Sequence, residues 1–530
     1  MNDITNNNEE NEVKSKNSNK NNFNEKSITK SYQDKISNDA WITLAILSLI
    51  GLIIVYGETM IIPAIPDLVE DFNIPYNTTA WILTAYLIAG AVATPIVGKL
   101  SDIYGKKRIL LLIMIIYTAG TSFGIISNDI STMIIVRTIQ GIGMSVFPIA
   151  FTIIREKFPE NKLSIAQGIL TSIFAAGGVI GLSLGATTIE YFSWHSTFIS
   201  ISPLALILTL IIMRFIHVKE QEDGGDDNNH IPLKKSIDIK GAITLTVTIS
   251  SFLISITLLG NSDSTDFNSI NNNAINLSLI ILFSVISIIS LFIFVLFQRR
   301  THTPLIDINL LKDRILLPTN ILLMTIGISM FMIYQTISIL IRNPSPSGFG
   351  GSAIDAANVQ LPFMIISLII SILSGFLISR FGNIKPTIIG SVISVIGFSS
   401  LFMYHSTEYE IIINLSIIAG GLSLAEVGGF NITLVSVSPK VSGISMGITV
   451  LLFLIGMSIG PAIFGIYLEM FQSPIMINEV SYSFPSAFSY DMIFLTSALL
   501  SFIFLILAIL TAKKIVSTIV ISKHSKYDSI

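Results

Sequence analysis

The chain consists mainly of long apolar segments separated by short polar connections. A helix needs about 20 mostly apolar residues to cross a bilayer, whereas the strands of an outer-membrane barrel alternate and give no such runs. The sequence therefore predicts an all-α membrane protein with fourteen transmembrane helices. They lie near residues 41–63, 79–99, 109–127, 131–152, 165–189, 195–217, 241–260, 274–298, 317–341, 356–380, 385–405, 410–436, 443–468 and 490–512.

Composition excludes several other classes of protein. Charged residues make up 12% of the chain and hydrophobic residues 51%, whereas a soluble domain has about 25% charged residues. The net charge of −3 gives a nucleic-acid partner no electrostatic support. The sequence has no cysteine, no phosphate-binding loop of the G-K-S/T type and no paired histidines with metal-ligand spacing. We therefore expect no cofactor, no metal site and no enzymatic activity.

Lys and Arg are distributed asymmetrically between the two sides of the predicted membrane. With the N-terminus inside and one crossing per segment, 29 of the 31 basic residues fall on the inner side. Arg137 lies within the fourth segment, and Arg342 falls outside. Cytoplasmic loops carry an excess of Lys and Arg, so this distribution supports the count of fourteen. We expect a multi-pass protein of the cell (plasma) membrane with both termini in the cytoplasm.

Two motifs occur twice along the chain. The glycine-containing segment 98–105, at the end of the second span, has a counterpart at 375–382, which lies 277 residues later. The glycine stripe at 177–185 has a counterpart at 456–461, with Gly181 and Gly460 separated by 279 residues. Because two independent motifs recur at nearly the same offset, the chain is predicted to contain two related halves with two spans inserted between them. Parallel halves around a central site are a transporter architecture.

The repeat defines a domain organisation. Residues 1–40 are rich in Asn, Lys, Glu and Ser, and we expect them to form a disordered cytoplasmic tail. Residues 41–217 form the N-terminal six-helix half, and residues 317–512 form the C-terminal six-helix half. Between them, residues 218–316 contain a cytoplasmic linker, the inserted spans 7 and 8 and the following loop. Residues 513–530 form a second cytoplasmic tail.

The loop between the second and third spans is a candidate gating element. Gly98 and Asp102 share one helix face, where glycine permits close helix approach and the carboxylate can meet a neighbouring helix N-terminus. Gly105 suits the tight turn, and Lys106 and Arg108 anchor it at the inner surface. We interpret the loop as a latch that stabilises one closed state. The alternative is a charged loop that simply follows the positive-inside rule.

Three charged residues lie within spans. Burial penalises an ionised carboxylate, so Glu58 in the first span is a candidate proton site; its alternative is an acid near the outer interface that water satisfies. Arg137 needs a partner or a wet cavity, unless its side chain reaches the outer surface. Glu426 has small neighbours and is either a second proton or cation site or a structural polar contact.

Two of these motifs resemble the signatures of the major facilitator superfamily. They are G-K-L-S-D-I-Y-G-K-K-R at 98–108 and R-T-I-Q-G-I-G at 137–143. The family usually has a basic residue where Ile103 stands, and the second copy of the loop has Ser379 in place of the acid. The resemblance implies the major facilitator fold and a link between Arg137 and proton coupling.

Further motifs resemble the 14-span drug:proton antiporter branch, which includes the tetracycline and multidrug exporters. The first span carries E-T-x6-P-D from Glu58 to Asp67, and segments 236–241 and 302–307 resemble the loops that flank the inserted pair. The fifth span matches the antiporter motif of the family in part. Gly178 stands where tetracycline exporters carry a glutamate, so the resemblance does not imply tetracycline as the substrate.

Two further groups of residues are candidates for transport roles. Small residues in spans 5 and 13 allow close helix packing and are candidate conformational elements. They are Gly177, Gly181, Gly185, Gly460 and Pro461. Amide and aromatic side chains within spans are candidates for the substrate cavity, although amides also join helices to one another. They are Gln140, Phe147, Tyr334, Gln335, Asn358 and Asn431.

These observations and the resemblance together predict a secondary active transporter. We expect proton-coupled efflux of small apolar or cationic compounds by alternating access, with Glu58, Arg137 and Glu426 in proton coupling. The expected partners are a small-molecule substrate, the proton and the lipid bilayer, and we expect a monomer. The alternatives are an exporter of another metabolite, siderophore or metal chelate, and a transport-inactive membrane sensor.

Overall fold

A computed structural model describes most of the chain. The described residues are 36–62, 64–74, 76–216, 238–259, 270–301, 304–306, 308–477 and 480–527. The predicted N-terminal tail up to residue 35, most of the linker before span 7 and the loop residues Ser236, His302 and Asp307 lie outside them.

Fourteen spans are present among the described residues, which confirms the predicted fold class. The N-terminal spans are α2 (Asn38–Thr59), α4 (Tyr76–Tyr104), α5 (Lys106–Gly124), α6 (Ile130–Gly141) continued by η1 (Ile142–Ser145) and α7 (Val146–Lys157), α8 (Glu160–Tyr191) and α9 (Trp194–Phe215). The inserted spans are α10 (Ile239–Leu259) and α11 (Ile270–Arg300). The C-terminal spans are α13 (Leu316–Arg342), α14 (Ala353–Phe381), α15 (Ile384–Met403), α16 (Glu408–Ser436), α17 (Ser442–Met470) and α18 (Ala487–Tyr527).

Shorter elements connect the spans. They are α3 (Ile65–Phe72), α12 (Ile308–Leu311), η3 (Pro439–Val441), β1 (Gln472–Ile477) and β2 (Val480–Pro485). The two strands pair antiparallel, with Gln472 opposite Pro485 and Ile477 opposite Val480. Sequence reasoning did not anticipate this hairpin. It also ended the last span at residue 512, whereas α18 continues as one helix to Tyr527.

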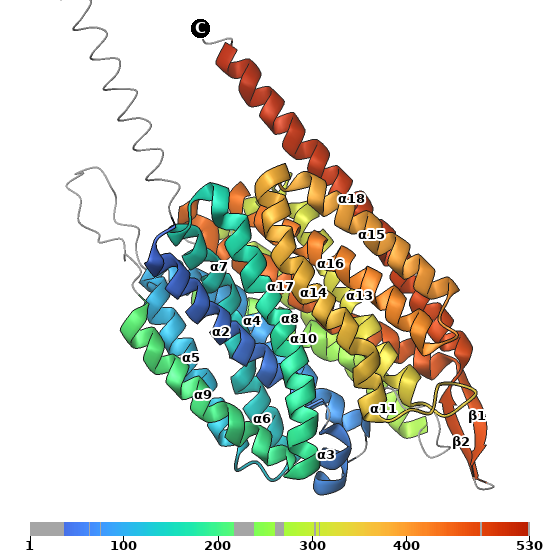
Figure 1. Cartoon of the computed structure of the whole chain (residues 1–530). Helices are drawn as coiled ribbons and strands as arrows, with labels where there is room; N and C mark the ends of the chain where they lie inside the picture. The colour runs from blue at the N-terminus through green and yellow to red at the C-terminus, as the bar shows by residue number, and fades with distance from the viewer. Residues whose placement is uncertain are drawn as a thin grey trace, which may run out of the picture.

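The two ends of the helix bundle differ. We call the end where α2 begins and α18 ends the terminal end, and the opposite end, which carries α3 and the β1–β2 hairpin, the hairpin end (Figure 1). The N-terminal and C-terminal halves lie side by side in Figure 1. Their most extensive contacts are between α4 and α17 and between α8 and α14.

Both halves contain close glycine contacts between their first and fifth helices. In α8, a Cβ added at Gly177 would lie 2.8 Å from the Leu52 carbonyl oxygen of α2, and one at Gly185 would lie 2.8 Å from the Met60 oxygen. In α17, a Cβ at Gly460 would lie 2.5 Å from the Ile328 carbonyl oxygen of α13. Glycine therefore lets the fifth helix of each half pack directly on the backbone of the first, as expected where small residues permit close helix approach.

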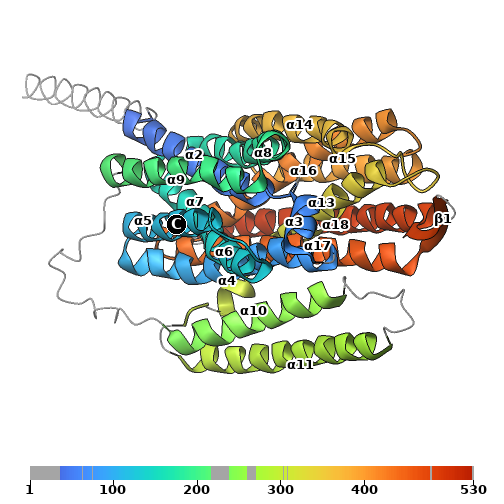
Figure 2. The same ribbon diagram turned by 90° about the horizontal axis from the view of Figure 1, so that it is seen from below.

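The inserted helices α10 and α11 lie along one side of the bundle (Figure 2). They pack on each other, and α10 contacts α4 and α17 at the seam between the halves. Asp238 caps α10 by accepting a hydrogen bond from the Gly241 N–H at 2.8 Å and another from Gln298 Nε2 at 2.7 Å. The Gln298 oxygen in turn accepts from the Ile306 N–H at 3.1 Å. These bonds tie the two loops that flank the pair to one another.

Candidate functional site

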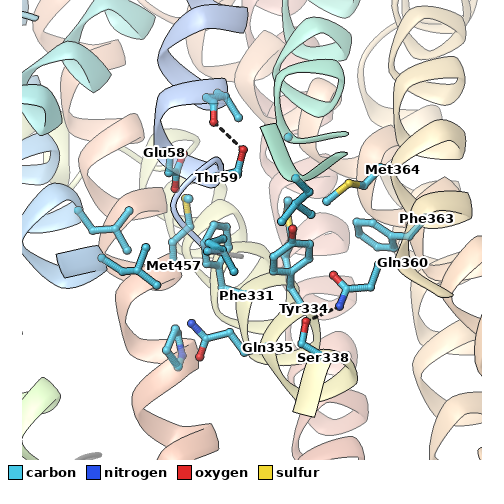
Figure 3. Close-up of a pocket in the computed structure, with 18 of the residues that line it drawn as sticks. Glu58, Thr59, Phe331, Tyr334, Gln335, Ser338, Gln360, Phe363, Met364 and Met457 are labelled. Carbon is cyan, nitrogen blue, oxygen red and sulfur yellow. Dashed lines mark hydrogen bonds between the residues drawn. The ribbon is translucent and has the colours of Figure 1, made fainter. Parts of the chain in front are cut away.

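A cavity of about 1020 Å³ lies between the two halves. Aromatic and methionine side chains form much of its wall, and both halves contribute to it. Figure 3 shows Glu58 and Thr59 from the end of α2, with Phe331, Tyr334 and Gln335 from α13. A largely apolar cavity with a few polar groups is the usual form of a small-molecule site.

The cavity reaches the surface at the hairpin end. Its lining there includes the exposed side chains of Glu190 and Arg342, together with Gln472 and Pro485 at the base of the hairpin. Toward the terminal end, three rings from both halves line the cavity. Phe430 stacks on Phe151 with centroids 5.2 Å apart, and it meets Phe453 edge to face at 5.6 Å.

Between these rings and the terminal end, the two halves are in close contact. The Asp102 carboxylate accepts a hydrogen bond at 3.0 Å from the Ile444 N–H in the first turn of α17. A Cβ at Gly98 would meet the Gly443 carbonyl oxygen at 2.5 Å. The predicted latch residues therefore lie at the contact between the halves, with the carboxylate at a helix N-terminus.

The second copy of the motif makes the equivalent contact with different chemistry. A Cβ at Gly375 would lie 2.5 Å from the Ser164 carbonyl oxygen of α8. The Ser379 hydroxyl donates to the Asn161 carbonyl oxygen at 2.7 Å. Sequence reasoning assigned no role to Ser379 because a serine there lacks the acidic group of Asp102. Its position in the repeat was the signal that could have identified it.

Two further hydrogen bonds join the halves near the terminal end. Asn431 donates to the Gln167 side-chain oxygen, and both residues are buried. Arg155 Nη2 donates to the Val437 carbonyl oxygen at 2.5 Å. Each bond connects the N-terminal half with the C-terminal half, so each must break if this end opens.

The basic residues of the loop hold the N-terminal half together. Lys106 forms an ion pair with Glu156 of α7, and Lys107 Nζ donates to the Met213 carbonyl oxygen of α9 at 3.1 Å. Arg108 is exposed. Gly105 has a φ of 94° and its repeat counterpart Gly382 has a φ of 78°, a region that side chains other than glycine rarely adopt.

Arg137 is completely buried next to the Glu58 segment. Its Nη1 donates to the Gly57 carbonyl oxygen at 2.7 Å and to Gln140 Oε1 at 3.3 Å. Its guanidinium lies 5.8 Å from the Tyr86 ring centroid, and its Nε and Nη2 have no hydrogen-bond partner. This position excludes the alternative in which the side chain reaches the outer surface, because none of it is exposed.

Glu58 lines the cavity and is 8% exposed. Among the described residues no ion pair joins Glu58 to Arg137, although the two are close enough to interact electrostatically. Glu426 lines the cavity from the other half. The described part of the chain contains no group of three His, Cys, Asp or Glu side chains that could hold a metal ion.

Four of the six predicted cavity residues line the cavity, namely Phe147, Tyr334, Gln335 and Asn358. The other two do not. Gln140 is buried behind the wall, where it accepts from Arg137 and donates to Thr121 Oγ1 at 3.1 Å. Asn431 faces Gln167 on the terminal side of the cavity. In both cases the amide joins helices, the alternative that sequence reasoning had left open for these side chains.

Sequence reasoning did not identify several lining residues. Phe430 and Phe453 belong to the three-ring cluster toward the terminal end, and Glu190 and Arg342 flank the mouth. Phe430 was detectable in principle because it follows Glu426 by one helical turn and so shares its face.

Comparisons with known proteins agree with this architecture. The sequence profile of the Major Facilitator Superfamily matches residues 47–461. Multidrug resistance protein 3 of Bacillus subtilis is 28% identical over 434 residues, which cover 81% of this chain and 78% of that protein. Multidrug resistance protein Stp of Mycobacterium tuberculosis is 22% identical, with 80% of this chain and 75% of that protein covered.

Solved structures show the same fold. The human organic anion transporter MFSD10 (TETRAN) superposes with a TM-score of 0.64 at 12% identity, covering 89% of this chain and all of that chain. The nucleoside transporter NupG superposes with a TM-score of 0.51 at 13% identity, covering 89% of this chain and 99% of that one. At these identities the likeness concerns the fold alone.

Proposed function

The chain belongs to the Major Facilitator Superfamily of membrane transporters, and we propose that it exports small apolar or cationic compounds in exchange for protons. The observation that carries this proposal is the cavity between the halves, which combines an apolar wall with the carboxylates of Glu58 and Glu426. The multidrug proteins among its relatives support the same class of substrate.

The proposed orientation places the terminal end in the cytoplasm of the cell and the hairpin end outside. It rests on the concentration of Lys and Arg in the segments at the terminal end. With this orientation in the plasma membrane, the structure is an outward-open state: the cavity reaches the outer surface while the contacts of Asp102, Ser379 and Gln167 close the inner side.

Glu58 and Arg137 form the proposed coupling site. In the outward-open state Arg137 bonds to the Gly57 carbonyl oxygen and leaves Glu58 without an ion pair, an arrangement that suits a protonated carboxyl. When Glu58 releases its proton, the unpartnered Nε and Nη2 of Arg137 are available to donate to the carboxylate. Proton binding from outside thus favours substrate release, and proton release inside favours substrate binding.

The two halves, residues 41–217 and 317–512, are the proposed moving bodies. The contacts that Gly98, Asp102, Gly375 and Ser379 make with the other half form when the inner side closes. The packing of Gly177, Gly181 and Gly185 on the first helix of their half, and of Gly460 beside Pro461 on α13, keeps each half intact during the movement. Because one chain contains the whole cavity, we propose that a monomer is sufficient for transport.

The test is substrate-dependent proton movement in proteoliposomes. Vesicles hold an acidic lumen with a pH-sensitive dye, and ethidium, tetraphenylphosphonium and the uncharged dye Nile red are added outside. We expect at least one of these compounds to alkalinise the lumen of vesicles that contain the wild-type protein. Glu58→Gln is expected to lose this response. Glu408→Gln, which alters an exposed carboxyl at the start of α16 outside the cavity lining, is the matched control and should retain it.

Two results would contradict the proposal. If compounds move without any proton movement, the protein is a transporter without proton coupling. If no compound of a broad panel moves at all, the transport-inactive sensor becomes the better interpretation. A response that Glu58→Gln leaves unchanged would refute the assignment of Glu58 while retaining antiport.

A further inference from the structure

The charged side chains that line the cavity differ in whether an opposite charge or water offsets their own charge. They are three acids, Glu58, Glu190 and Glu426, and one base, Arg342. Glu190 and Arg342 are exposed at the mouth, where water screens them. Glu58 lies beside the buried guanidinium of Arg137. Glu426 is different, because no hydrogen bond or ion pair from any described residue reaches it.

Such a carboxylate is costly in the middle of a membrane protein. Acidic side chains within spans normally pair with a cation, bind a proton or face a ligand pathway. Glu426 faces the pathway, since it and its neighbours Leu422, Ser423 and Phe430 on α16 all line the cavity. A cation that neutralises the Glu426 carboxylate can therefore reach it directly through the cavity.

The rings next to Glu426 suit a cation. Phe430 lies one helical turn from Glu426, and it packs on Phe151 with the planes inclined by 23° and on Phe453 with the planes inclined by 73°. Aromatic faces are electronegative and attract organic cations within about 6 Å. A carboxylate one helical turn from a ring of this cluster therefore offers a charge and a polarisable apolar surface in the same cavity.

We propose that Glu426 and the Phe151–Phe430–Phe453 cluster form the subsite for the charged group of a lipophilic organic cation. The inference rests on the proposed function only in placing the transported compound in this cavity. It separates two roles: Glu58 with Arg137 exchanges the proton, and Glu426 recognises the positive charge of the substrate. The cavity volume of about 1020 Å³ leaves room for an organic ion with several rings.

The test compares the binding of a cation with that of a neutral analogue. Radiolabelled tetraphenylphosphonium and uncharged triphenylphosphine oxide are titrated onto the full chain in nanodiscs at one pH without a gradient. Glu426→Gln is expected to weaken tetraphenylphosphonium binding about tenfold or more, because the attraction between the carboxylate and the phosphonium charge is lost. Binding of triphenylphosphine oxide should change less than about twofold, which also shows that the variant is folded.

Three further variants sharpen the test. Glu426→Asp keeps the charge and should retain most of the preference for the cation. Phe430→Leu removes one ring and should weaken cation binding about fivefold while sparing the neutral analogue. Glu408→Gln is the control for a carboxyl on the same helix, because Glu408 is exposed in the first turn of α16 and does not line the cavity; it should leave both affinities unchanged.

The inference is overturned if wild type shows no preference for the cation, if Glu426→Gln binds it as wild type does, or if both probes weaken equally. Equal weakening would mark Glu426 as a structural contact, whereas unchanged cation binding would leave it as a second proton site. The proposed function fails separately. If cation binding depends on Glu426 but the proteoliposome assay shows no proton movement, antiport is contradicted and this subsite is not. If antiport is normal but cation binding does not depend on Glu426, this subsite is contradicted and antiport is not.

Discussion

The carboxylate of Asp102 in the N-terminal half accepts a hydrogen bond from the backbone N–H of Ile444 in the C-terminal half, at 3.0 Å. Ile444 is the third residue of α17, so the negative charge lies at the positive end of a helix dipole. The contact exists only while the terminal end is closed. Its energy therefore contributes directly to the equilibrium between the two transport states.

Replacing Asp102 by asparagine should shift the protein toward the state that is open at the terminal end. The amide keeps the shape but loses the charge, which at a partly buried helix N-terminus is worth about 1–2 kcal/mol. The population ratio should then change about 5- to 30-fold. The sequence contains no cysteine, so Tyr104→Cys and Val435→Cys can carry spin labels for distance measurements without further substitutions. Both positions are exposed and lie on opposite halves.

Glu156→Gln is the matched control for this experiment. It breaks the Lys106–Glu156 ion pair, which lies within the N-terminal half and does not change when the halves separate. We expect the label distances of this variant to match those of the wild type. Equal distance distributions for Asp102→Asn and wild type would show that the contact does not influence the equilibrium.

The spans and the repeat were predictable because each follows from a local pattern. Apolar runs give the helices, and the positive φ of Gly105 and Gly382 explains why glycine recurs at this point of each copy. The direction in which a span faces was not predictable. In a lipid environment the outward face of a helix is as apolar as the inward one, so periodicity could not distinguish the cavity residue Phe453 from a lipid-facing ring.

The errors at Gln140 and Asn431 have the same physical origin. An amide in a span needs a hydrogen-bond partner, and the sequence does not show whether that partner is a substrate or another helix. The partners on other helices, Thr121 for Gln140 and Gln167 for Asn431, become visible only when the helices are placed. The hairpin at 472–485 was missed because a short pair of strands between spans has no apolar signal of its own.

Gly181→Ala should destabilise the N-terminal half. Its new methyl group would collide with Thr59 Oγ1 and lie 3.0 Å from the Tyr56 carbonyl oxygen, and backbone atoms of α2 cannot yield easily. Overpacking of this kind costs about 1–3 kcal/mol. Gly178→Ala, three positions earlier, is the matched control because its methyl group would find only Met364 Cε, at 3.8 Å. Thermal unfolding of the two purified variants should show a lower midpoint for Gly181→Ala alone.

Removing the hydrogen bond between Gln167 and Asn431 should also favour opening at the terminal end. The two amides join the halves and are buried, so Asn431→Ala leaves the Gln167 oxygen without this donor. A double-mutant cycle with Gln167→Ala, read from the same label distances, should give a coupling energy of about 0.5–1.5 kcal/mol in the closed state. Strictly additive effects of the two substitutions would mean that the bond contributes nothing to closure.

Arg137→Lys should uncouple substrate movement from proton movement although the charge is kept. The guanidinium bonds to the Gly57 carbonyl oxygen through Nη1 and still holds Nε and Nη2 free on the side chain, whereas a lysine ammonium offers one compact group on a flexible stem. A lysine that bonds to Gly57 is therefore poorly placed to pair with Glu58 as well. We expect the proteoliposome assay to retain downhill movement of a transported dye, with proton movement reduced at least about tenfold, which corresponds to about 1.4 kcal/mol. Thr138→Ala, on the exposed face of the same helix, should behave like wild type. Full proton movement in Arg137→Lys would show that a positive charge alone is sufficient at this position and that the geometry of the guanidinium has no part in coupling.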